Sequence, residues 1–126
     1  MKTKDTAVNS KDCAASTDCI FCKIIAGDFG TEFIYEDDYV VAFDDLHPQK
    51  PVHTLIVPRC HVVNLEDNPS SELLAAVFGA VPKVAAIKGV ADSGYRIIVN
   101  NGAGGGQTIF HMHVHLLGGQ PLDESF

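Results

Sequence analysis

Apolar residues in the first half of the chain occur in short runs that turn-forming residues interrupt. The run from Cys19 to Ala26 predicts a short helical turn, which Gly27 ends. Short runs bounded by Gly, Asp or Pro are otherwise typical of β-strands. Three strands are therefore predicted here, with a tight turn at Asp37-Asp38 after the first: Glu32 to Glu36, Val40 to Phe43 and Thr54 to Val57.

The second half begins with the only long helical pattern. Asn68-Pro69 suits a helix start, because Asn caps helix N-termini and Pro fits the first position. Pro82 removes a backbone donor, so we expect it to kink this helix. Gly89 is suited to end it. The apolar positions recur at helical spacing: Leu73, Val77, Val81, Val84 and Ile87.

Two further strands follow the helix. They are Arg96 to Val99 and Phe110 to Leu117, and a glycine-rich loop at 102–106 separates them. Only the helix between strands three and four could serve as a parallel crossover, so the sheet should be antiparallel. The pattern predicts an α+β fold: a five-stranded antiparallel sheet with one long and one short helix.

Composition narrows the class of protein. The 126 residues and their 46% hydrophobic content suit one domain, which we place at 18–126 after a flexible N-terminal tail at 1–17. No apolar run approaches the roughly 18 residues of a membrane helix. Acidic residues outnumber basic ones 16 to 9, which gives a charge of −7 and disfavours nucleic acid polymers as partners. We therefore predict a cytoplasmic protein with no membrane partner.

Three histidines near the C-terminus occupy every second position: His111, His113 and His115. On a strand they would share one face, with successive side chains about 6.5–7 Å apart. The residues between and beside them are apolar and should face the core, which turns the histidine face toward solvent or a cleft. These apolar residues are Phe110, Met112, Val114 and Leu116.

Three interpretations fit this pattern. It could be a polar outer strand face, or a catalytic zinc site, since His-x-His on a strand chelates metals. A zinc site usually has nearby carboxylates, and none lies between Asp92 and Asp123. The third interpretation is nucleophilic catalysis on phosphorus, because neutral imidazole is a nucleophile near neutral pH. We favour the third.

The segment HMHVHLL from His111 resembles the signature of the histidine-triad (HIT) superfamily, in which three histidines alternate with apolar residues. The similarity continues through "CIFCKIIAGD", "FDDLHPQKPVHTLIVPRCH" and "YRIIVNNGAGGGQTIFHMHVHLLGG". It is closest to the Hint-like branch, the purine nucleoside phosphoramidases. This resemblance implies a HIT-like fold and a homodimer. A dimer would also cover the strand Arg96 to Val99 if it lies at a sheet edge, beside a helix rich in alanine.

The resemblance also implies the catalytic residues. His113 would attack the α-phosphorus of a nucleoside monophosphate that carries a leaving group, and water would then release the nucleotide. His115 would contact the phosphate, while His53 and His111 would complete the histidine cluster. No cofactor is required for this catalysis.

A nucleotide site follows from the same resemblance. Asp45 would bind the ribose hydroxyls, with Phe43 and Leu46 beside the base. Asp44 stands where the Hint-like branch often has His, so base contacts are expected to differ. The glycine-rich loop could be a flexible hairpin loop, or its N–H groups could approach a phosphate. By resemblance, the phosphate site is lined by Asn100, Gly106 and Thr108.

Cys19 and Cys22 form a C-x-x-C pair with three interpretations. They could be plain buried residues, a redox pair or half of a structural zinc site, which needs two more ligands. We favour zinc. By resemblance to bacterial relatives, the other ligands would be His61 and His111, with Cys60 as an alternative to His61.

Two classes of function remain. The favoured one is a hydrolase of purine nucleoside phosphoramidates or related nucleotidyl esters that acts through a nucleotidyl-histidine intermediate on His113. The other is a nucleotide-binding regulatory or scaffold module with little turnover. Within the enzyme class, a dinucleoside polyphosphate hydrolase also fits.

Overall fold

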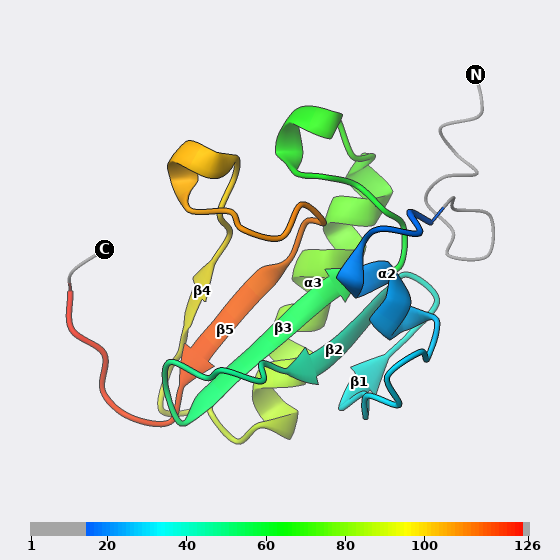
Figure 1. Ribbon diagram of the computed structural model, residues 1–126. Coiled ribbons are helices and arrows are strands. Elements are labelled where there is room, and N and C mark those ends of the chain that lie inside the picture. The colour runs from blue at the N-terminus through cyan, green and yellow to red at the C-terminus, as the bar shows by residue number, and fades with distance from the viewer. Residues whose placement is uncertain (1–14, 125–126) are drawn as a thin grey trace.

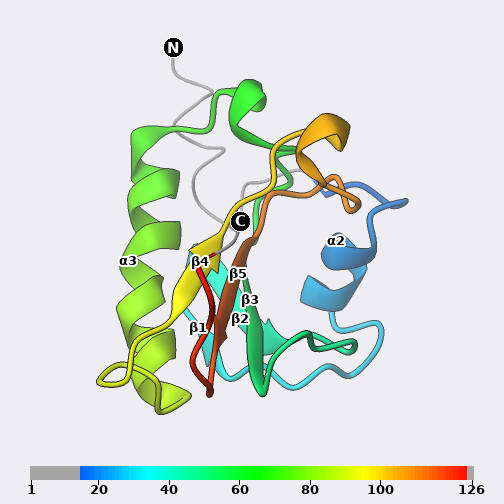
Figure 2. The same ribbon diagram turned by 90° about the vertical axis from the view of Figure 1, so that its left-hand side faces the viewer.

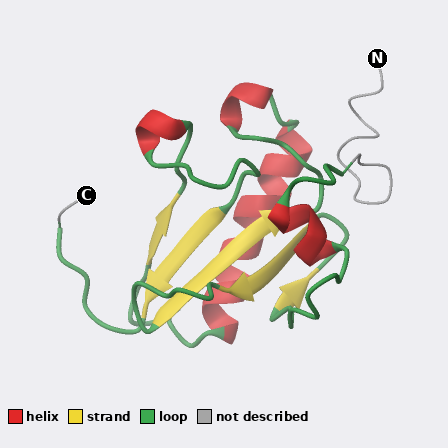
Figure 3. Cartoon of the chain, viewed as in Figure 1, coloured by secondary structure: helices red, strands yellow, loops and turns green. Residues whose placement is uncertain are grey.

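The computed structural model describes residues 15–124 and contains one antiparallel sheet with a helix on each face (Figure 1). The strand order is β1-β2-β3-β5-β4, and all neighbouring strands are antiparallel, which confirms the predicted five-stranded antiparallel sheet. Figure 2 shows α3 and α2 on opposite sides of the sheet, and Figure 3 separates helices from strands by colour. The strands are β1 Tyr35–Glu36, β2 Val40–Asp44, β3 Val52–Pro58, β4 Arg96–Ile98 and β5 Val114–Gly118. The helices are α2 Ile20–Ile25 and α3 Ser71–Ile87, with short 3-10 turns at η2 Leu65–Asp67 and η3 Ala103–Gly105.

The sheet is buried on both faces, so β2 is apolar at four successive positions rather than alternating. Val40 and Ala42 pack in the cluster beneath α3. Val41 and Phe43 point the other way and pack with Phe21 of α2. The helices α3 and α2 therefore pack in separate hydrophobic clusters. Only the cluster that contains Phe21 of α2 borders the site described below.

The long helix begins later than predicted. Asn68 ends the η2 turn with φ 54°, a left-handed conformation that cannot cap α3. Ser70 is the N-cap instead, and its hydroxyl accepts a hydrogen bond from the Leu73 N–H at 3.1 Å. The helix continues through Pro82, and Gly89 follows its C-cap with φ 75°, as a left-handed helix end requires.

Several strand boundaries also differ from the prediction. The first strand is only two residues long, and the third begins at Val52 and so includes His53. The fifth begins at Val114, because the chain bends at 109–111 and the Met112 N–H bonds to the Val62 carbonyl at 2.7 Å.

This bend limits the predicted alternation of faces. Met112, Val114 and Leu116 are buried as expected, whereas Phe110 is 47% exposed, so its placement on the core face was wrong. Of the three histidines expected to face solvent or a cleft, His111 and His113 are buried and His115 is half-buried.

The N-terminal tail predicted at 1–17 falls mostly outside the described residues. Among residues 15–124, no helix is both long and apolar enough to cross a membrane.

Candidate functional site

His113 is held just before β5 by a backbone hydrogen bond. Its Nδ1 lies 2.7 Å from the carbonyl oxygen of His111. A carbonyl oxygen only accepts, so Nδ1 must carry the hydrogen. Neutral His113 therefore has its lone pair on Nε2, which is the atom a nucleophilic imidazole must present.

Packing keeps this imidazole in place and neutral. The ring of Phe21 meets it edge-on, with centroids 5.0 Å apart, and the ring of His115 lies 4.8 Å away. Burial lowers the pKa of His113, although the hydrogen bond to the His111 carbonyl and the charge of Asp45 act in the opposite direction. Near neutral pH the side chain is an uncharged base.

His53 and His115 form a directed pair across β3 and β5. The backbone N–H of Gln49 donates to Nδ1 of His53 at 3.0 Å, so neutral His53 carries its hydrogen on Nε2. That Nε2 lies 2.9 Å from Nδ1 of His115. His115 therefore accepts at Nδ1 and keeps an N–H at Nε2, which is available to an anion. Burial, followed by the charges of His113 and His53, lowers the pKa of His115 to about 4.

Asp45 lies beside this pair, at the end of β2. Its Oδ2 is 3.5 Å from Nε2 of His53, and its Oδ1 accepts from the His47 N–H at 2.8 Å. The structure thus brings the acid predicted to bind ribose next to the histidines predicted to act on phosphorus.

An apolar cleft opens between α2 and the sheet and reaches Asp45. This cavity of about 250 Å³ is lined by Phe43, Leu46 and Leu55 on the sheet side and by Ile20 and Ile24 on α2. Leu46 is 88% exposed.

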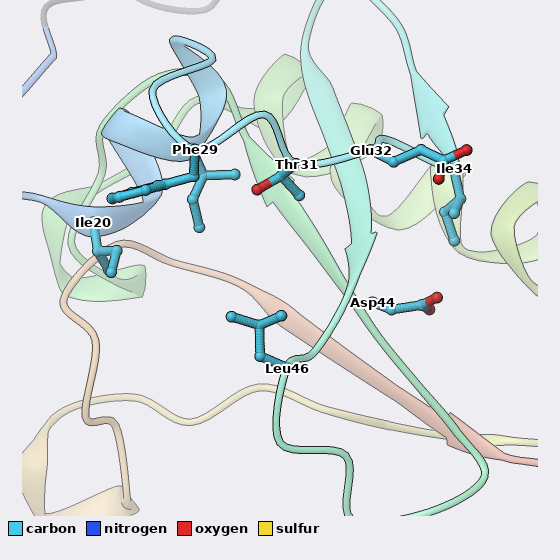
Figure 4. A pocket seen from close by; sticks show the side chains of 8 residues that line it. Ile20, Phe29, Thr31, Glu32, Ile34, Asp44 and Leu46 are labelled. Atoms are coloured by element: carbon cyan, nitrogen blue, oxygen red, sulfur yellow. The ribbon is translucent and has the colours of Figure 1, made fainter.

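A neighbouring cavity of about 520 Å³ extends the cleft toward Phe29, and Thr31 lines both cavities. Figure 4 shows Leu46 pointing toward the side of the opening where Ile20 and Phe29 lie. The exposed apolar surface suits a flat ring at this place.

Asp44 borders the cleft, but its carboxylate is occupied elsewhere. It accepts from the Thr54 hydroxyl at 2.9 Å and forms an ion pair with Lys88 at the end of α3, also at 2.9 Å. Asp44 and Asp45 are neighbours in the sequence, yet one joins α3 to the sheet and the other faces the histidines.

The glycine-rich loop is anchored by Gln107, which the sequence analysis did not select. Its Oε1 accepts from the Gly102 N–H at 2.8 Å and from Asn64 at 3.0 Å. Its Nε2 donates to the carbonyls of Val63 and Ile109 at 2.7 and 3.0 Å. All the hydrogen-bonding positions of this amide are used at 3% exposure, so the loop is shaped without a ligand. A Gln after a glycine run was the only signal in the sequence.

The predicted phosphate residues lie before, within and after this loop: Asn100, Gly106 and Thr108. Gly106 has φ 92°, and a side chain there would meet Asn100 at 3.8 Å. Thr108 borders a separate cavity of about 420 Å³ together with His61. This cavity adjoins the cleft, since Ile20 and Ile109 line both.

Four side chains that could bind a metal ion lie close together beside His113. The cluster consists of Cys19, Cys22, His61 and His111, and its ligand atoms all lie within 4.8 Å of one another. Nδ1 of His111 is 3.3 Å from Sγ of Cys19, 3.6 Å from Sγ of Cys22 and 3.2 Å from Nδ1 of His61. A tetrahedral Zn²⁺ with ligands at about 2.0–2.3 Å spaces them roughly 3.3–3.8 Å apart.

The hydrogen bonds of His111 test whether a metal fits. Its Nε2 donates to the Pro58 carbonyl at 2.8 Å, so Nδ1 has a lone pair directed at the cluster. Burial lowers the pKa of His111 to about 4, which leaves it neutral. Burial also raises the pKa of the Cys22 thiol, so a bound cation would have to displace that proton. Cys60 packs with Leu73 outside the cluster. The four residues can therefore hold a metal ion.

A second convergence, of Asp45, His53 and His115, does not suit a metal. Because Gln49 donates to Nδ1 of His53, the Nε2 that faces the other two groups carries a hydrogen rather than a lone pair. In this group His53 and His115 share a hydrogen bond, and the Asp45 carboxylate lies 3.5 Å from Nε2 of His53.

Comparison with known proteins identifies the family of the chain. The HIT domain model matches residues 27–122. The chain belongs to the HIT family. A HIT-like protein of Chlamydia pneumoniae is 45% identical over 105 residues, covering 82% of this chain and 94% of that protein. The purine nucleoside phosphoramidase of Escherichia coli K12 is 40% identical over 105 residues, covering 82% of this chain and 88% of the enzyme.

Solved structures of HIT proteins show the same fold. The HIT family hydrolase from Clostridium thermocellum superposes with a TM-score of 0.84 at 40% identity, covering 88% of this chain and 98% of that one. A histidine triad protein from Clostridium difficile gives the same score and identity, covering 90% and 100%.

Proposed function

We propose that this HIT protein hydrolyses purine nucleoside phosphoramidates or related nucleotidyl esters through a covalent nucleotidyl-histidine on His113. The observation that carries the proposal is the 2.7 Å hydrogen bond from Nδ1 of His113 to the His111 carbonyl, which leaves the lone pair on Nε2. The name of the similar E. coli enzyme, purine nucleoside phosphoramidase, supports this choice of substrate.

The reaction has two steps. In the first, the Nε2 lone pair of His113 bonds to the α-phosphorus, and the P–N bond breaks with its electron pair on the leaving amine, which takes a proton from solvent. In the second, water bonds to phosphorus, the P–Nε2 pair returns to His113, and one water proton is released. The net change is hydrolysis to a nucleoside monophosphate and an amine. In this proposal the Nε2–H of His115 stabilises the phosphoryl oxygens.

The nucleoside lies along the cleft in this proposal. Asp45 accepts hydrogen bonds from the ribose, and the base stacks against Phe43 and Leu46. The phosphate is met by the loop residues Asn100, Gly106 and Thr108. His53 orients His115, and His111 orients His113.

Removing the nucleophile should abolish turnover but keep binding. His113→Asn should hydrolyse a fluorogenic adenosine phosphoramidate at least roughly 10³-fold more slowly, as expected for a lost nucleophile. A titration with AMP serves as the control and should show that the site remains intact. Near-normal turnover in this variant would eliminate the covalent mechanism on His113, whereas little turnover in the wild-type protein would favour a binding module.

The two adjacent acids provide a matched test of ribose recognition. Asp45→Ala should weaken AMP binding about 10-fold or more, because hydrogen bonds to a charged group are lost, and should affect the 2′,3′-dideoxy analogue much less. Asp44→Ala removes the neighbouring carboxylate, which bonds to Thr54 and Lys88, and should leave AMP binding close to wild type. An equal loss for both nucleotides in Asp45→Ala would show that this carboxylate does not bind the ribose.

We also propose that Cys19, Cys22, His61 and His111 bind one structural Zn²⁺. Elemental analysis of protein purified without chelator should find about one equivalent of zinc. Cys22→Ser should lose most of it, because one of four ligands is removed. Wild-type protein that contains no metal, and whose thermal stability does not respond to added Zn²⁺, would rule the site out.

Assembly into a two-fold homodimer is the remaining proposal. β4 lies at the sheet edge, and Ile97 on it is 39% exposed, as is Phe78 on α3. A symmetric contact between two β4 strands would cover both edges. Light scattering at low micromolar concentration should give a mass about twice the 13.5 kDa of one chain. The Ile97→Lys variant should have a lower mass. A wild-type mass near one chain would contradict the dimer.

A further inference from the structure

The helix α2 is too short to hold its position alone. It has six residues, whereas isolated helices shorter than about 12 residues are marginal in water. Apolar contacts of Phe21 and Ile24 attach it to the sheet. Within residues 15–124, its side-chain polar contacts to the segments around the sheet are those of Cys19 and Cys22 with His61 and His111.

The two cysteines lie at the N-terminal end of this helix. Cys19 is the N-cap, and its sulfur accepts from the Cys22 N–H, so both sulfurs lie on one side of the first turn. Their partners come from different segments, since His61 follows β3 and His111 precedes β5. A metal bound to all four would join α2 to both segments at once.

The same helix forms one wall of the nucleotide cleft. Ile20 and Ile24 line the cavity that reaches Asp45. Between the two cysteines, Phe21 lies edge-on to the rings of both His111 and His113, at 5.8 and 5.0 Å. A displacement of α2 would therefore open the cleft and release one side of the nucleophile.

We infer that metal binding at Cys19, Cys22, His61 and His111 controls nucleotide affinity by docking α2 against the sheet. The metal site thus assembles the cleft, beyond stabilising the fold. The inference rests on the proposed function only for the identity of the ligand as a nucleotide. It requires that the docking of α2 depend on the metal. The packing of α3 on the opposite face of the sheet should not depend on it, because α3 has its own core.

Hydrogen exchange on the full chain tests the docking step directly. Zn²⁺-loaded protein is compared with protein treated with chelator and thiol reductant. The α2 amides of Lys23 and Ala26, which bond to the carbonyls of Cys19 and Cys22, should exchange at least about 10-fold faster without metal. Amides of α3 should keep their protection, and added Zn²⁺ should restore that of α2.

AMP titration of the same samples tests the consequence. The dissociation constant should rise at least about 10-fold on chelation and recover with Zn²⁺. Val84→Ala provides the matched control, since Val84 is a fully buried residue of α3 and packs on the face of the sheet away from the cleft. This variant should lower the melting temperature but leave AMP affinity within about twofold of wild type.

Three results would overturn the inference. They are unchanged α2 exchange on chelation, loss of protection throughout the chain, and unchanged AMP affinity once α2 is released. Zn²⁺-loaded protein that fails to bind AMP would instead refute the proposed function and the affinity claim with it. The exchange data would still show whether metal docks α2.

Discussion

The hydrogen bond from His113 to the carbonyl of residue 111 determines most of what this site can do. It fixes the tautomer of the proposed nucleophile, and it depends on the chain not being a regular strand at that point. β5 begins only at Val114, so the His111 carbonyl lies outside the strand pairs of the sheet and can accept from a side chain. A strand that started at Phe110, as the alternation suggested, would direct this carbonyl toward the ladder.

Residue 111 connects three parts of the molecule. Its Nε2 bonds to the end of β3, its Nδ1 faces the cysteine pair, and its carbonyl holds His113. The lone pairs on Nδ1 of His111 and on Nε2 of His113 require neutral rings, and burial favours neutral rings by lowering the pKa values of His111, His113 and His115. Burial thus keeps these rings neutral, whereas the carbonyl hydrogen bonds, which by themselves raise the pKa, determine which nitrogen keeps the lone pair.

Residue patterns predicted the architecture because the relevant information is local. Short apolar runs indicated the strands, and the spacing of histidines and cysteines, with the family resemblance, indicated which of them meet. Features that depend on tertiary contacts were missed. No local pattern shows that a bend exposes Phe110 or that Gln107 anchors the loop. The cap of α3 is a local feature, but Asn68 and Ser70 are both good capping residues and the pattern does not choose between them. The adjacent acids Asp44 and Asp45 differ only through what each faces in the folded chain.

The tautomer of His113 is the most direct test of this account. Long-range ¹H–¹⁵N correlation spectra of the full, Zn²⁺-treated chain near pH 7 distinguish the two ring nitrogens of each histidine. The account predicts a protonated Nδ1 and a bare Nε2 for His113, with the opposite arrangement for His53. A His113 ring protonated at Nε2 would contradict the account, because the nitrogen proposed to attack phosphorus would then have no lone pair.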